Sequence, residues 1–159
     1  YLTLDTTNAE VSNNVVFNGT DSTDSVFSVG SSRSTSGNDF IAYCFHSVPG
    51  YSQAGSHNGN GSSDGTYVYT GFRPAWVMLK SYDNTRNWTI FDNKRTPYNL
   101  IDGHLHANAS VAEQTGEDEV DFLSNGFKFR SGDADSNYSN FDYVYFAFAE
   151  QPFKYSNAR

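Results

Sequence analysis

Five residues on one short stretch of the chain have side chains that suit carbohydrate binding. Aromatic rings can stack on the apolar faces of sugar rings, while amide and guanidinium groups hydrogen-bond to the hydroxyl groups. The candidate glycan contacts are Tyr82, Asn84, Arg86, Asn87 and Trp88. The alternative for Trp88 is a core position facing Trp76 across a hairpin, and Tyr51, His57 and Asn60 form a second candidate group.

The remaining reactive side chains lack the partners that catalysis requires. Cys44, the only cysteine, lies in the apolar run 40–45, where we expect it to pack in the core rather than to act as a nucleophile with His46. Glu150 ends a hydrophobic segment, and we expect it to pair with Arg73 or Lys80 rather than to act as a general acid. The chain has no glycine-rich phosphate loop and no hydrolase motif, so we predict no catalytic residues.

The spacing of potential ligand residues gives little support for a metal or cofactor site. His104 and His106 have the spacing of two metal ligands on one strand face, with Asp102 as a third ligand. This pattern on a polar segment is common without a metal, and no loop supplies the oxygen ligands of a calcium site. We therefore predict neither a metal nor a cofactor.

The charge balance disfavours nucleic acid as a partner. The net charge is −8 and the isoelectric point is about 4.7, whereas binding to phosphates requires a basic patch. No stretch approaches the roughly 20 apolar residues that a membrane-spanning helix needs, so we expect no membrane insertion.

The elements that position these residues are predicted to be strands. Aromatic residues make up 16% of the chain, and apolar positions alternate between polar turns. We predict strands at 2–4, 15–17, 26–29, 40–48, 67–70, 75–81, 88–91, 120–123, 127–130 and 141–150, with long polar loops at 52–66 and 131–140. The pair Asn125-Gly126 predicts a hairpin between two of these strands, because both residues tolerate positive φ.

About ten strands and almost no helix signal predict an all-β fold, namely a jelly-roll-like β-sandwich. We expect Phe45, Trp76 and Phe148 to lie between its two sheets. The length of 159 residues fits one domain, 1–159. Because the chain begins with Tyr1 rather than Met, we expect it to be part of a longer polypeptide.

Several long runs resemble an uncharacterised domain family of marine bacteriophages and uncultured marine viral genomes. They span nearly the whole chain: LDTTNAE at 4–10, IAYCFHSVPGYS at 41–52, GNGS at 59–62, YTGFRPAWVMLK at 69–80, DFLSNGFK at 121–128 and AFAEQPF at 147–153. In that family the domain often ends a larger virion protein, sometimes after a laminin-G or concanavalin-like module. It has no catalytic residues to transfer.

The resemblance implies a structural protein on the surface of a tailed phage particle. One expectation is a tail fibre or spike tip that binds a host glycan or another receptor. The alternative is a capsid decoration or assembly module with a purely structural role. In both cases we expect the partners to be other virion subunits, in a homo-oligomer for which a trimer is favoured.

Overall fold

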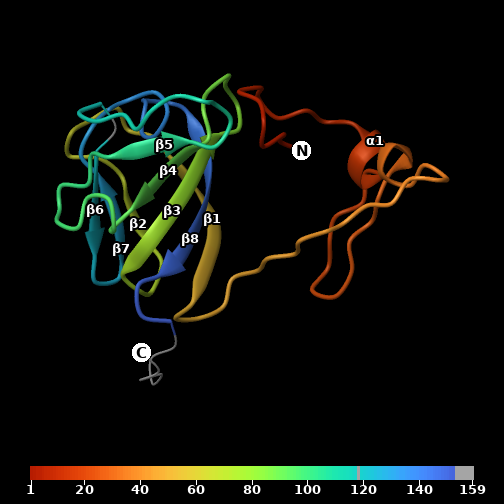
Figure 1. Ribbon diagram of the computed structural model, residues 1–159, viewed down its shortest axis with the longest axis horizontal. Helices are drawn as coiled ribbons and strands as arrows, with labels where there is room; N and C mark the ends of the chain where they lie inside the picture. Colours follow the sequence, from red (N-terminus) through yellow and green to blue (C-terminus); the bar gives the residue numbers. More distant parts are fainter. Residues whose placement is uncertain (118, 153–159) are drawn as a thin grey trace. The chain divides into compact units, whose positions relative to one another are not determined.

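The computed structural model describes residues 1–117 and 119–152 (Figure 1). The chain divides into two units. The first comprises Tyr1–Leu2 and Glu10–Phe45, and the second comprises Thr3–Ala9 and the chain from His46 onward. All strands of the described residues lie in the second unit.

Eight strands form two antiparallel sheets in the described part of the chain. They are β1 (Ser52–Asn58), β2 (Tyr67–Tyr69), β3 (Pro74–Ser81), β4 (Thr89–Asp92), β5 (His104–His106), β6 (Val120–Leu123), β7 (Gly126–Phe129) and β8 (Asp142–Ala149). One sheet has the order β1-β8-β3-β4-β5 and the other has the order β2-β7-β6. The fold is therefore an all-β sandwich, as predicted, with eight strands rather than about ten.

The core lies between the two sheets and is rich in aromatic rings. Phe127 of β7 contacts Tyr145 of β8 edge-on, with ring centroids 5.4 Å apart, and Phe129 stacks on His57 of β1 at 4.8 Å. All four side chains are at most 8% exposed. These two contacts join the three-stranded sheet to the five-stranded sheet, because each ring pair has one member in each.

Two of the three residues that we expected between the sheets lie on the outer face of the five-stranded sheet. Trp76 and Phe148 are cross-strand neighbours with ring centroids 5.7 Å apart, and both are half-buried. Val77, which follows Trp76, and Ala147, which precedes Phe148, are fully buried and face the core. The prediction was wrong by one residue of register, which reverses the face in a strand.

The hairpin predicted at Asn125-Gly126 is confirmed, but for a different physical reason. Leu123 pairs with Gly126 across a turn formed by Ser124 and Asn125, and neither Asn125 nor Gly126 has positive φ. A Cβ atom on Gly126 would lie 2.1 Å from the Val68 carbonyl oxygen in β2. Glycine is therefore required here because two strands approach closely.

Replacing Gly126 by alanine is expected to push β2 away from β7 and to lower the free energy of unfolding by about 1–3 kcal/mol, the usual cost of overpacking. Urea denaturation of the purified protein measures this change. Ser124→Ala, in the same turn, serves as the control and should stay within about 0.5 kcal/mol of the wild type, as expected of a surface substitution. Equal stability of the two variants would contradict the close approach at Gly126.

Sequence patterns misjudged the segment around the first strand. The range 52–66 was predicted to be a loop, yet Ser52–Asn58 forms β1 and pairs with β8 along its whole length. The range 40–48 was predicted to be a strand, but only Val48 forms a bridge, to Ser52. Phe45 is 67% exposed and Cys44 is also exposed, so both core predictions were wrong.

The unit that contains Glu10–Phe45 has little regular structure. Its helix α1 (Asn14–Phe17) is capped by the Asn13 side chain, and the 3₁₀ helix η1 (Ser31–Arg33) follows later. The strands predicted at 2–4, 15–17 and 26–29 do not form. Both helices of the described residues are too short to span a membrane.

Candidate functional site

The five candidate glycan contacts lie on the loop between β3 and β4, and hydrogen bonds from the buried Lys80 side chain hold this loop in place. Lys80, at the end of β3, is fully buried, and its Nζ atom donates hydrogen bonds to the carbonyl oxygens of Ser81 and Asn84. Burial lowers the pKa of Lys80, while the nearby charges of Asp135 and Asp83 oppose this shift. The loop therefore folds around the buried Lys80 side chain.

Asp83 fixes the start of the loop. Its Oδ1 atom accepts hydrogen bonds from the Ser81 hydroxyl over 2.8 Å and from the Asp142 backbone N–H over 3.2 Å. Burial alone would raise the pKa of Asp83, but hydrogen bonds from Ser81, Asn84 and the backbone outweigh it and hold the pKa below its ordinary value. The carboxylate is therefore ionised at neutral pH, and its hydrogen bonds stabilise the start of the loop.

The side chain of Asn87 is occupied by partners within the chain. Its amide donates to Asp135 Oδ2 over 2.8 Å and accepts from Asn108 Nδ2 over 2.9 Å. The Asn108 side-chain Oδ1 atom accepts from the Trp88 backbone N–H over 2.7 Å, and the Trp88 indole N–H donates to the Thr3 backbone carbonyl over 3.0 Å. Three segments far apart in sequence thus meet at this loop.

Arg86 lies over a ring rather than in open solvent. Its guanidinium carbon is 5.5 Å from the centroid of the Phe141 ring, a distance at which cation–π attraction acts. The Arg86 backbone N–H donates to the Thr7 carbonyl over 3.0 Å. Its buried Nε atom has no hydrogen-bond partner among the described residues.

The structure brings all five predicted residues together, each of them half-buried. The Asn87 amide and the Trp88 indole N–H already have partners within the chain. Much of the hydrogen bonding that we expected them to make to sugar hydroxyls therefore stabilises the loop instead. Trp88 precedes β4, and Trp76 pairs with Asp92 instead, so the alternative of a Trp76–Trp88 pair does not form. Sequence could have suggested Lys80, which follows an apolar run, but not Asp135 or Asn108.

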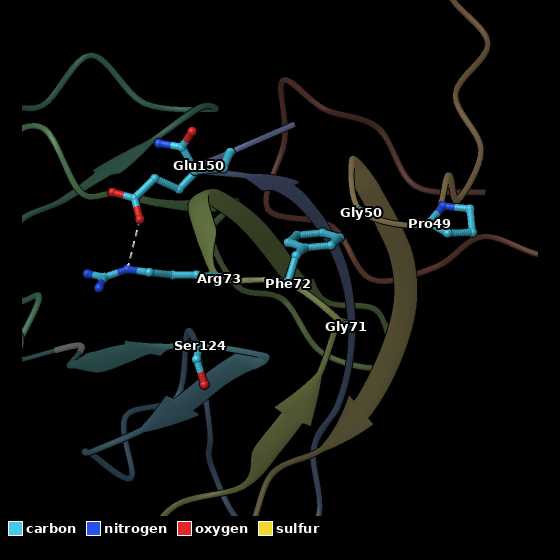
Figure 2. Close-up of a pocket in the computed structure, with 8 residues that line it drawn as sticks. Pro49, Gly50, Gly71, Phe72, Arg73, Ser124 and Glu150 are labelled. Carbon is cyan, nitrogen blue, oxygen red and sulfur yellow. Dashed lines mark ion pairs between the residues drawn. The ribbon is translucent and has the colours of Figure 1, made fainter. Parts of the chain in front are cut away.

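A hollow lies at the other end of β3 from this loop, where several turns meet (Figure 2). It has a volume of about 550 Å³, and its lining residues are Pro49, Gly50, Gly71, Phe72, Arg73, Ser124, Glu150 and Gln151. Arg73 Nε lies 3.2 Å from Glu150 Oε2, and Glu150 Oε1 accepts from Asn93 over 2.7 Å. The predicted pairing of Glu150 with Arg73 is confirmed.

The histidine pair of β5 faces the core side of the sheet. His104 is 1% exposed, and its ring centroid lies 5.3 Å from that of His106. His106 Nε2 is 2.7 Å from the Gln114 side-chain oxygen, so this nitrogen carries a hydrogen and donates it. No group of three or more potential metal ligands gathers anywhere in the described residues.

The exposed apolar side chains of residues 10–45 form the most unusual surface of the described chain, and they were not predicted from the sequence. Every valine, isoleucine, phenylalanine and tyrosine of 10–45 except Val16 is at least 40% exposed. The largest exposures are those of Ile41 at 81% and Tyr43 at 80%. Soluble proteins rarely expose so many large apolar side chains on one segment unless it takes part in an interaction.

Comparison with known proteins adds a family but no activity. Residues 1–152 match a family model described as a domain of unknown function, DUF7483. No curated protein and no solved structure matches the chain. The match covers 10–45 together with all the strands of the described residues, so the exposed apolar segment is part of what the family model describes.

Proposed function

The chain belongs to the DUF7483 family of domains of unknown function, and we propose that it is a non-catalytic structural module of a virion surface. One observation carries the structural role: a segment of 36 residues, 10–45, leaves nearly all of its large apolar side chains in solvent. The virion context rests on the resemblance of the runs at 41–52 and 69–80 to phage virion domains.

Exposed apolar side chains favour assembly because burying them in an interface is worth about 25 cal/mol per Å². Val16 is the one large apolar side chain of the segment that is buried, at 7% exposure, and it lies in the short helix α1. A segment with so little core of its own gains stability chiefly by packing against another subunit. We therefore propose a decoration or assembly module within a homo-oligomer on the particle surface.

The decisive experiment asks whether the protein is on the particle. Antibodies raised against the chain should label intact particles of a phage that encodes it, as seen by immunogold electron microscopy. Antibodies against an internal protein of the same phage provide the control and should label only disrupted particles. Absence of the chain from purified particles, by mass spectrometry, would overturn the proposal.

Binding of a host glycan at the loop 82–88 is the second candidate function. It is favoured by the rigidity of the loop, which is held in place by Lys80 and by the hydrogen bonds of Asn87 to Asp135 and Asn108. A site ordered before binding loses less entropy when the ligand arrives.

If this loop binds sugar, Trp88→Ala should weaken binding to an array of bacterial surface polysaccharides by about 10-fold or more, since an aromatic anchor contributes over ~1 kcal/mol. Tyr98→Ala provides a matched control, because Tyr98 is 82% exposed and lies outside the loop. Binding that survives Trp88→Ala unchanged would exclude this loop as the site, and silence across the array would count against glycan binding itself.

A further inference from the structure

The hollow at the start of β3 contains polar groups that have no hydrogen-bond partner in the described part of the chain. Arg73 Nε lies 3.2 Å from Glu150 Oε2, but this N–H is not aligned for a hydrogen bond. Among the described residues, the Nη1 and Nη2 atoms of Arg73 have neither a hydrogen bond nor an ion pair. Glu150 Oε1 accepts from Asn93, whereas Oε2 has only the ion pair with Arg73 in that part of the chain. The hollow therefore offers the donors of a guanidinium group beside a carboxylate acceptor.

The charges of these two side chains balance each other. At a separation of 3.2 Å, the fields of the cation and the anion largely cancel over the rest of the hollow. The other lining residues carry no charge: Pro49, Gly50, Gly71, Phe72, Ser124 and Gln151. The chain as a whole has a net charge of −8, which disfavours anionic ligands. The hollow thus suits a neutral ligand with hydroxyl groups, because a hydroxyl both accepts and donates hydrogen bonds.

The other end of the hollow is apolar. Figure 2 shows Phe72 and Pro49 on the side away from the Arg73 guanidinium group. Gly50 and Gly71 line the same end, and both have positive φ, at 73° and 80°. Glycine adopts this backbone conformation without strain, and it places no side chain in the hollow. A ligand with apolar C–H groups on one part and hydroxyl groups on another matches this layout.

Hydrogen bonds hold the walls of the hollow in place. The Thr70 N–H donates to the Asn125 carbonyl over 3.0 Å, and the Thr70 hydroxyl donates to the Phe72 carbonyl over 2.7 Å. The Glu150 N–H donates to the Arg73 carbonyl over 2.9 Å. These bonds join the turn before β3 to the β6–β7 turn and to the end of β8. A site ordered before binding loses less entropy when the ligand arrives.

We propose that this hollow binds a neutral saccharide. The Nη atoms of Arg73 donate to its hydroxyl oxygens, Glu150 Oε2 accepts from one of its hydroxyl groups, and its apolar C–H groups face Phe72 and Pro49. The volume of about 550 Å³ lies within the range of roughly 300–1,000 Å³ that is usual for small-molecule sites. This inference goes beyond the structural role and holds whether or not the chain is part of a particle. The site is also distinct from the loop 82–88, because the eight residues of β3 separate the two by roughly 25 Å.

NMR titration of the isotopically labelled full chain tests this site. Maltose, cellobiose and lactose serve as the ligands, at millimolar concentrations that suit a dissociation constant on the order of 1 mM. At least one of them should shift the Arg73 Nε–H signal and the backbone N–H signals of 71–73, while the Trp88 indole signal stays unchanged. Absence of these shifts with all three sugars would overturn the proposal. Shifts confined to the Trp88 indole signal would also overturn it, in favour of the loop 82–88.

Replacing Arg73 by glutamine removes the guanidinium donors. Affinity for the disaccharide that responds should fall about 10-fold or more, since hydrogen bonds to charged groups are the stronger ones. Arg130→Gln is the matched control, because Arg130 is 37% exposed against 41% for Arg73 and its ion pair with Asp121 lies outside the hollow. Arg130→Gln should retain the wild-type affinity. Wild-type affinity in Arg73→Gln would overturn the proposal.

Glu150→Gln separates a neutral ligand from an anionic one. The substitution is nearly isosteric and retains an oxygen for Asn93, so it tests the site even if Arg73→Gln fails to fold. It leaves the charge of Arg73 unbalanced. The variant should bind the disaccharide about 10-fold more weakly than the wild type, but glucuronate more tightly. Tighter binding of glucuronate than of the disaccharide by the wild type, or unchanged disaccharide binding by Glu150→Gln, would each overturn the proposal.

Discussion

Replacing Phe127 by alanine should lower the free energy of unfolding by about 3–5 kcal/mol, as is usual when a buried ring is removed from a core. Phe127 is fully buried, and its ring meets Tyr145 from the opposite sheet. The variant loses apolar burial and also one of the contacts that hold the two sheets together. Since domains of this size are typically stable by only about 5–15 kcal/mol, the loss is a large part of the total.

Guanidinium denaturation followed by tryptophan fluorescence measures this effect, because Trp76 and Trp88 both belong to the sandwich unit. Tyr98→Ala is the control, since Tyr98 is 82% exposed and should change the stability by less than about 0.5 kcal/mol. A loss below about 1 kcal/mol for Phe127→Ala would mean that the two sheets do not share one core.

Acidification from pH 6.5 to pH 4 should destabilise the protein by up to about 3 kcal/mol through the single side chain of His57. His57 is 8% exposed and stacks between the rings of Phe129 and Tyr143, at 4.8 and 4.9 Å. Burial lowers its pKa from 6.5 to about 4, and the Ser136 carbonyl and the Asp142 charge only partly oppose this.

The hydrogen bonds of His57 explain why the folded protein excludes the second proton. Its Nε2 atom donates to the Ser136 carbonyl over 3.1 Å, and its buried Nδ1 atom has no partner among the described residues. Protonation would bury an N–H group with no acceptor. Below pH 6.5 the unfolded chain gains a proton that the folded chain does not, so the free energy of unfolding falls until the pH reaches about 4.

Urea titrations at several pH values between 7 and 4 measure the slope. His57→Phe keeps the stacked ring but cannot titrate, so its stability should vary much less over this range. His46→Gln, which removes an exposed histidine, should keep the wild-type slope. The lowered pKa values of Asp83 and Asp92 affect the stability only where the unfolded chain begins to protonate its aspartates, below about pH 5, so the slope between pH 7 and about pH 5 is free of them. A wild-type stability that is flat from pH 6.5 to pH 4 would contradict the burial of His57.

The sequence predicted the central strands β3 and β8 of the five-stranded sheet correctly but missed its edge strand β1. The runs that became β3 and β8 are apolar on both faces, so their strand character was evident without knowing the register. β1 was missed because its outward residues are small or polar and its inward positions include Gly55, where a Cβ atom would meet the Tyr145 ring. Its role depends on the partner strand, which local patterns do not encode.

The opposite error occurred at 40–45. Aromatic and β-branched residues favour strands because they pack on a pleated surface, but propensity does not say where that surface is. In the candidate site, proximity in the sequence was enough to gather Tyr82 to Trp88 on one loop. The partners that occupy their polar groups, Asp135 and Asn108, come from distant segments and could not be predicted.

The position of β8 also determines when the protein can fold during synthesis. β8 comes last among the described strands but lies between β1 and β3, pairing Ser52 with Phe148 (Figure 1). Until β8 has been made, β1 has no neighbouring strand to bond, and β3 can bond only to β4 on its other side. Such long-range pairing slows folding and prolongs exposure to aggregation. Lower growth temperature, which weakens the association of exposed apolar surfaces, should therefore raise the yield of soluble protein.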